Sequence, residues 1–258
     1  MTRVALLSDI HGNLIALEAV LADIARQGSF DGTLVAGDLV WAGPWPAEVV
    51  DLTRASGATV IQGNTDAFFR RSIEDTAPGK REGRFAEHLT WMTDRLGTER
   101  IRYLTHLPFS HRISPAPGHD LLVVHANPQD LDRPIIAKTS EAELDDLLLT
   151  GGDEADWEAL AFGHVHAPFT RAWRGRLLVD VASAGLPMDG DPRAVYAILT
   201  WDRGHWQAEH RRVHYDVPVV AHRMRTSGMP RGKHFAERLT AAAYSVLVAA
   251  QMAAATVE

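Results

Sequence analysis

The sequence predicts an α/β fold with one largely parallel sheet followed by a second sheet. In residues 1–61, short apolar segments alternate with segments of helical periodicity, which is the βαβαβ pattern of a parallel sheet. From residue 120 onwards, apolar strands follow one another across short turns, which favours an antiparallel-rich second sheet. Because no low-complexity linker and no internal repeat divides residues 1–258, we expect a single domain.

The N-terminal half should contain three strands with two helices between them. The strands are expected at residues 4–8, 33–36 and 58–61. Asn13 can cap the first helix, in which residues 14, 17, 21 and 24 place apolar side chains on one face. Pro46 suits the first turn of the second helix, and Gly57 is expected to end it.

The middle of the chain has helical spacing over residues 85–107, with a break near Gly97 and an end at Pro108. The remaining strands are expected at residues 120–125, 160–162, 169–173, 177–181, 194–201 and 206–214. An alanine-rich helix is expected from about residue 234. Its uncharged part, residues 239–257, is near the ~20 residues of a membrane span but is only weakly apolar. We therefore expect no membrane span and a helix that packs on the core or joins two copies of the chain in a homo-oligomer.

Composition restricts the function. The chain has no cysteine, which excludes disulfides, thiolate metal sites and cysteine nucleophiles and fits a cytoplasmic location. Its first residues hold too short an apolar run for a signal peptide. The formal net charge of -7 argues against extensive nucleic-acid binding, which needs clustered positive charge. A small anionic substrate stays compatible with this charge, because a bound metal ion would dominate the local field.

Polar side chains that can bind metals follow the expected strands. They are Asp9, His11, Asp38, Asn64, His125, His164 and His166. The carboxyl ends of parallel strands line one edge of a sheet, where ligands bind. In the pairs Asp9-x-His11 and His164-x-His166, an extended backbone would point both members the same way. Glycines at 12, 37, 63 and 163 would allow tight turns and close backbone approach beside the cluster.

The number and type of these side chains predict a metal centre. Oxygen and imidazole ligands without sulfur suit manganese, iron or zinc. Seven ligands are too many for one ordinary site and about right for two divalent ions that share a bridging carboxylate. Manganese (Mn2+) is favoured, and nickel and cobalt also fit such ligands.

The same motifs, in this order from Asp9 to His166, resemble those of the calcineurin-like metallophosphoesterase superfamily. Residues 182–199, ASAGLPMDGDPRAVYAIL, also resemble the small prokaryotic branch with phosphodiesterase-like members. The resemblance implies a four-layer αββα sandwich of two mixed sheets around a dinuclear centre. It also implies in-line attack on phosphorus by a hydroxide that bridges the two metals, without a phosphoenzyme.

The resemblance assigns roles residue by residue. Asp9, His11 and His166 would hold the first metal, Asn64, His125 and His164 the second, and Asp38 would bridge them. Many family members follow the Gly-Asn pair with a histidine that serves the leaving group, whereas this chain has Thr65 and Asp66. Threonine donates a hydrogen bond but cannot supply a proton near neutral pH, so the general acid is unidentified. The candidate catalytic residues are Asp38, Asn64 and Asp66, and the candidate substrate-binding residues are Asn13 and Thr65.

The resulting prediction is a dinuclear metal-dependent phosphoesterase for a small phosphate ester, more specifically a phosphodiesterase acting on small or nucleotide substrates. Two alternatives within the enzyme class are a phosphoprotein phosphatase and a dinucleoside polyphosphate phosphatase. A third alternative is a non-catalytic scaffold, because one eukaryotic trafficking subunit resembles this fold but lacks a complete metal set. The seven competent ligand positions of this chain favour the enzyme.

Overall fold

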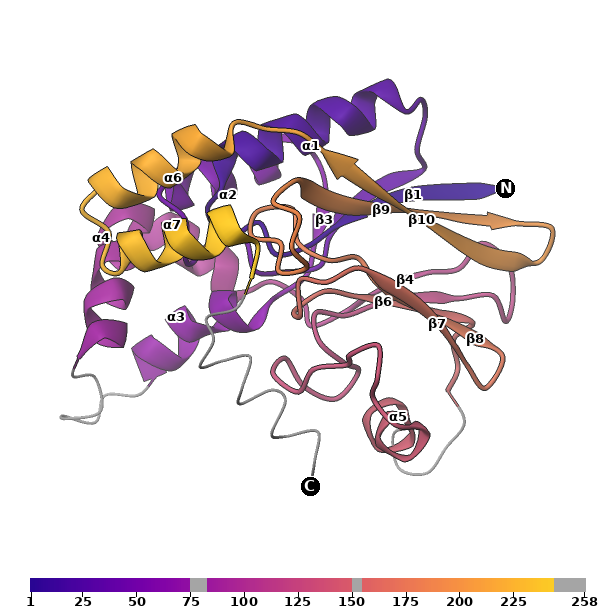
Figure 1. Cartoon of the computed structure of the whole chain (residues 1–258). Helices are drawn as coiled ribbons and strands as arrows, with labels where there is room; N and C mark the ends of the chain where they lie inside the picture. The colour runs from indigo at the N-terminus through magenta and orange to yellow at the C-terminus, as the bar shows by residue number, and fades with distance from the viewer. Residues whose placement is uncertain (75–82, 150–154, 244–258) are drawn as a thin grey trace.

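The computed structural model describes residues 1–74, 83–149 and 155–243 (Figure 1). Within them, two five-stranded sheets are flanked by seven helices. The first sheet has the order β10(His205–Val213), β9(Ala194–Asp202), β1(Thr2–Leu7), β2(Gly32–Val35), β3(Thr59–Val60). The second has the order β4(His111–Ile113), β5(Leu121–Val123), β6(Ala159–Phe162), β8(Arg176–Asp180), β7(Phe169–Trp173). The helices are α1(Leu14–Arg26), α2(Pro46–Ala55), α3(Asn64–Glu74), α4(Arg84–Thr105), α5(Glu141–Leu148), α6(Val217–Thr226) and α7(Gly232–Ala241).

Side-chain alternation along the strands builds the four layers. In β1, Val4 and Leu6 belong to the core between the two sheets, whereas Ala5 and Leu7 belong to the core under α1, α2 and α4. This alternation is expected because successive strand residues point to opposite faces. On the far side of the second sheet, Leu160 packs with residues of α5. The predicted αββα sandwich is therefore confirmed.

The parallel pairing of the first three strands is also confirmed. β1 pairs in parallel with β2, and β2 with β3. The predicted helices of this region are present, and Asn13 caps α1 by accepting a hydrogen bond from the Ala16 amide. The break in α4 lies at Gly97, whose φ of 68° is not helical.

The prediction that all later strands form one antiparallel-rich sheet is wrong. β9 and β10 join the first sheet, where β9 pairs antiparallel with β1. In the second sheet, β5 pairs with β6 and β6 with β8 in parallel, and only the outer pairs are antiparallel. Alternation identifies a strand but does not identify its partner, which is decided by packing of distant segments.

The C-terminal region differs from the expectation. α7 begins near the predicted start, but it ends at Ala241, and the next residue, Ala242, has a left-handed φ of 47°. Most of the alanine-rich segment expected to be helical, residues 244–258, lies outside the described residues, so its role in oligomerisation stays a prediction. The sequence reading assigned no structure to α5, although Ser140 and Glu143 form a capping box at its start.

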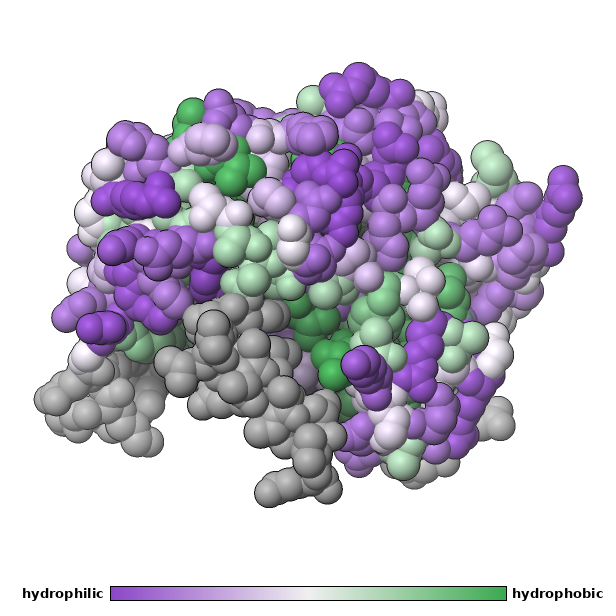
Figure 2. All heavy atoms as spheres, in the orientation of Figure 1, coloured by the Kyte–Doolittle hydropathy of each residue, from purple (hydrophilic) through white to green (hydrophobic). Residues whose placement is uncertain are grey.

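Hydrophilic side chains cover most of the face shown in Figure 2, with apolar side chains gathered near its middle. No helix within residues 1–74, 83–149 and 155–243 is long and apolar enough to cross a membrane.

Candidate metal centre

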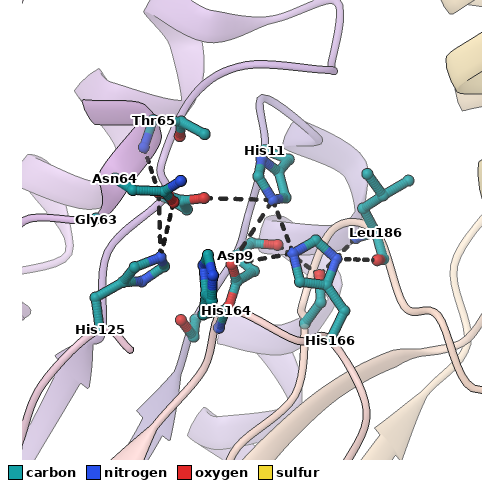
Figure 3. A network of polar contacts seen from close by, with 12 residues as sticks. Asp9, His11, Gly63, Asn64, Thr65, His125, His164, His166 and Leu186 are labelled. Carbon is teal, nitrogen blue, oxygen red and sulfur yellow. Dashed lines mark hydrogen bonds and ion pairs between the residues drawn. The ribbon is translucent and has the colours of Figure 1, made fainter. Parts of the chain in front are cut away.

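The predicted ligands gather where the two sheets meet at their carboxyl edges (Figure 3). Three loops follow β1, β2 and β3, and two follow β5 and β6 of the second sheet. Hydrogen bonds join the loops: the His11 amide donates to the Asp38 carbonyl at 2.9 Å, and the His164 amide to the Asp9 carboxylate at 2.9 Å. The second of these bonds joins a loop of one sheet to a loop of the other, so both sheets contribute to the site.

The backbone at five of the seven predicted ligands is left-handed rather than extended. φ is 54° at Asp9, 50° at His11, 54° at Asp38, 73° at His164 and 61° at His166. The expected orientation of the Asp-x-His and His-x-His pairs from an extended backbone is therefore wrong, although both members of the first pair still reach one cluster. Left-handed conformations are unfavourable for residues with a Cβ, and such strain collects at functional sites.

Asp9, His11 and His166 form a first group of buried side chains. Asp9 Oδ1 lies 3.1 Å from His166 Nε2 and 3.6 Å from His11 Nε2. The two Nε2 atoms are 3.1 Å apart. Three donor atoms thus converge on one point, as the ligands of a single cation do.

Asp38 lies between this group and a second one. Its Oδ2 is 3.7 Å from His11 Nε2, and its Oδ1 is 3.5 Å from His125 Nε2. On the second side, Asn64 Oδ1 lies 3.1 Å from His125 Nε2. Asp9, Asp38 and His125 also offer ligand atoms within 4.8 Å of one another. The two carboxylate oxygens of Asp38 therefore face different groups of ligands.

Backbone carbonyls set the tautomers of the histidines. The Nδ1 atoms of His11, His125 and His166 lie 3.2, 2.8 and 2.6 Å from the carbonyl oxygens of Val40, Ala36 and Leu186. A carbonyl only accepts, so each Nδ1 donates its proton, and each Nε2 keeps its lone pair for the cluster. This arrangement is usual for metal-ligating histidines.

His164 is oriented the other way round. Its Nε2 lies 2.9 Å from the Asp132 carbonyl, so Nδ1 is the nitrogen left for a ligand. Its ring centroid is 5.1 Å from that of His125. It is not part of either close group of ligand atoms.

Burial and neighbouring charges shift the pKa values of the cluster residues. Burial, reinforced by His166, lowers the pKa of His11 to about 3, and burial with His125 lowers that of His164 to about 4. Both rings are therefore neutral near pH 7. Burial acts to raise the pKa of Asp9, but attraction to His166, His125 and His11 outweighs it and holds this pKa below its usual range. Burial and repulsion from Asp9 raise the pKa of Asp38 to about 8.

One buried oxygen of the cluster has no hydrogen-bond donor among the described residues. Asp9 Oδ1 is fully buried and accepts no hydrogen bond. An unpaired buried carboxylate oxygen costs free energy, and a cation at this point would satisfy it. The site residues therefore fit a divalent metal ion.

Asp66, a predicted catalytic residue, holds the loops instead of facing the cavity. It is fully buried, and its carboxylate accepts hydrogen bonds from the amides of Asp38, Leu39 and Gly63 at 2.8–3.1 Å. Burial and the Asp38 charge raise its pKa to about 7, although these amides favour the charged form. The expectation that Asp66 acts directly in catalysis is not supported by this position, because it has no contact with the cavity.

The two predicted substrate-binding residues differ in position. Thr65 lines the cavity, and its amide donates to Asp38 Oδ1 at 2.9 Å while its hydroxyl donates to the Val40 carbonyl. Asn13 is fully buried, caps α1 and donates to the Gly185 carbonyl at 2.8 Å. The structure does not bring Asn13 to the cavity, because the amide group is used within the protein.

A cavity of about 360 Å³ opens over the cluster. Besides predicted ligands and Thr65, its lining includes Trp41, Asp132, Arg231, Phe235 and Arg238. Sequence reasoning did not include these five among the site residues. The last three come from α7 and the residue that precedes it. Their i, i+4, i+7 spacing was the available signal, since residues so spaced share one helix face.

Comparison with known proteins agrees with this geometry. The family model for calcineurin-like phosphoesterases matches residues 2–172. An uncharacterised protein of Methanocaldococcus jannaschii is 28% identical over 244 residues, which cover 89% of this chain and 94% of the relative.

Two crystal structures cover nearly the whole chain. A metallophosphoesterase from Sphaerobacter thermophilus is 28% identical with a TM-score of 0.71, covering 93% of this chain and 99% of its own. A hypothetical protein from Pyrococcus horikoshii OT3 shares the fold, with 20% identity, a TM-score of 0.75 and coverage of 95% and 100%. The expected resemblance is thereby confirmed, and the chain belongs to the calcineurin-like phosphoesterase family as a metal-dependent phosphoesterase.

Proposed function

We propose that this protein is a dinuclear phosphoesterase that cleaves small or nucleotide phosphodiesters. The observation that carries the proposal is the position of Asp38, whose two carboxylate oxygens face His11 on one side and His125 on the other. A carboxylate placed in this way suits a bridge between two cations.

Asp9, His11 and His166 would hold one ion, and Asn64, His125 and His164 the other. When bound, two such ions supply an activated water and electrostatic stabilisation for in-line displacement at phosphorus. The chain fixes the ligands beforehand: carbonyls orient the imidazoles, and the Thr65 amide orients Asp38. Asp66 binds the loop after β2 to the loop after β3.

The cavity supports a small substrate. Its volume of about 360 Å³ lies in the range of small-molecule sites. Trp41 and Phe235 give it two aromatic side chains, which suit a nucleobase or another planar group. A phosphoprotein or dinucleoside polyphosphate substrate remains the alternative for the same chemistry. The scaffold alternative is disfavoured, because every ligand position carries a competent side chain.

The metal content tests the proposal directly. The protein purified with added manganese should contain two equivalents of metal per chain, because two sets of ligands share Asp38. Elemental analysis measures the stoichiometry, and anomalous scattering from crystals locates the ions. One ion per chain, or two ions away from Asp38, would contradict the dinuclear centre. The same measurement with iron, zinc, nickel or cobalt ranks the metals.

Thr65 gives a second test. Because neither Thr65 nor the enclosed Asp66 is placed to donate a proton, activity should depend steeply on leaving-group basicity. Thr65→His adds a group with a reference pKa of about 6.5. General acids typically contribute about 10²–10⁴-fold. We expect a gain near the lower limit on esters with poor leaving groups and little change on nitrophenyl esters.

The test is the slope of log(kcat/KM) against the pKa of the leaving group, measured for the unmodified protein and for Thr65→His. A shallow slope for the unmodified protein would show that another group already delivers the proton. Equal slowing of every substrate by Thr65→His would show that the new ring only crowds the cavity.

A further inference from the structure

One wall of the cavity is a face of α7 that lies outside the family match over residues 2–172. Arg231, Phe235 and Arg238 line it together. The first two side chains are in contact, with the Arg231 guanidinium carbon 5.4 Å from the centroid of the Phe235 ring. The ligands His11, Asp38 and His166 line the same cavity.

The position of this wall is fixed by packing. Phe235, Ala236 and Leu239 of α7 are buried against Met224 of α6 and Leu186. At the start of α7, a Cβ on Gly232 would lie 2.0 Å from the Met224 carbonyl oxygen, so the two helices meet without room for a side chain. Arg231 precedes this contact with a left-handed φ of 61°. The base of each arginine is therefore held in place, while the guanidinium groups can reach a ligand.

The two arginines of this wall differ in their surroundings. Within the described residues, no carboxylate lies at ion-pair distance from the exposed Arg231, whereas Lys233 on the same helix approaches Glu237 at 4.0 Å. Arg238 lies close enough to the cluster to contribute to the lowered pKa of His11. Its Nη2 is 3.8 Å from Met188 Sδ. Two positively charged side chains thus line the cavity of a chain whose net charge is -7.

The metal ligands already account for binding the phosphate that is cleaved, since two divalent ions would neutralise it. The guanidinium groups that line the same cavity complement a further anionic group, and arginine suits phosphate because its planar fork donates two parallel hydrogen bonds. Asp132, another lining residue, would repel an anion, which favours the α7 side.

We infer that Arg231 and Arg238 bind a second phosphate group, so that the preferred substrates are phosphate esters that carry another phosphate besides the one cleaved. This inference rests on the proposed function and names the substrate class of the same site. Bisphosphorylated nucleotides and their esters belong to this class.

Binding to the manganese-loaded protein tests the inference without requiring turnover. The probes are thymidine 3′,5′-bisphosphate and thymidine 5′-monophosphate, which differ only in the second phosphate. Calorimetric titration should give a Kd about tenfold lower for the bisphosphate. Arg231→Gln, and separately Arg238→Gln, should remove most of this preference and change the Kd of the monophosphate by less than about twofold.

Lys233→Gln is the matched control, since it removes one charge from the same helix at an exposed position outside the cavity. It should leave the preference intact. Equal binding of the two probes to the unmodified protein, equal weakening of both by Arg231→Gln, or loss of the preference in Lys233→Gln would each overturn the inference. Preferential binding without hydrolysis of thymidine 5′-phosphate nitrophenyl ester would instead contradict only the proposed function.

Discussion

Asp38→Asn is expected to remove more than nine-tenths of the phosphoesterase activity at saturating manganese. The amide has no charge and presents only one oxygen, so it cannot bridge two cations as a carboxylate does. The fold should survive, because the asparagine oxygen can still accept from the Thr65 amide. In the metal-free protein the substitution even removes the repulsion between Asp38 and Asp9 that helps to raise the pKa of Asp38. The metal-free variant should therefore melt at the same temperature as the unmodified protein or above it.

Turnover and metal content of the variant, measured together, check this result. Asp180→Asn is a matched control: Asp180 is also fully buried, burial also raises its pKa, and its Oδ1 accepts from the Ala182 amide. It lies outside both groups of ligand atoms, so its variant should keep activity within about threefold. If Asp38→Asn retained more than about a tenth of the turnover, a loss of under about 1.4 kcal/mol in barrier terms, Asp38 would not be the bridge.

Gly63→Ala is expected to have the second large effect, on both stability and activity. The added Cβ would lie 2.1 Å from Asp38 Oδ1 and 2.2 Å from the Asp38 amide nitrogen. The loops after β2 and β3 must then separate, although Asp66 accepts hydrogen bonds from both. Overpacking of this kind costs about 1–3 kcal/mol. Displacement of the Asp38 carboxylate should also lower turnover at least tenfold.

Gly32→Ala separates this contact from a general effect of replacing glycine. Neither glycine has a left-handed φ, and the nearest atom to a Cβ at Gly32 is Leu34 Cδ1 at 3.9 Å. The free energy of unfolding, measured with denaturant, should change by less than about 0.5 kcal/mol for Gly32→Ala. Full activity of Gly63→Ala, or similar losses of stability in both variants, would show that close approach at Gly63 does not set the position of Asp38.

Local chemistry made much of this protein predictable from its sequence. The parallel β1, β2 and β3 follow from the alternation of short apolar segments with helical ones, and Asn13 is a helix cap because its side chain can accept from an amide three residues later. The ligand positions are polar residues that interrupt apolar strands. Their order along the chain is enough to indicate the family.

Only the tertiary structure decided how these parts meet. β9 joins the first sheet by pairing with β1, which lies almost two hundred residues earlier, and β10 joins it by pairing with β9. Alternation along a strand carries no information about such partners. The pairs Asp9-x-His11 and His164-x-His166 adopt left-handed turns instead of extended strands, because hydrogen bonds between loops set their φ angles. The α7 wall with Arg231 reaches the ligands through packing of α7 on α6 and Leu186. Contacts between segments so distant in sequence depend on the whole fold and leave no local pattern.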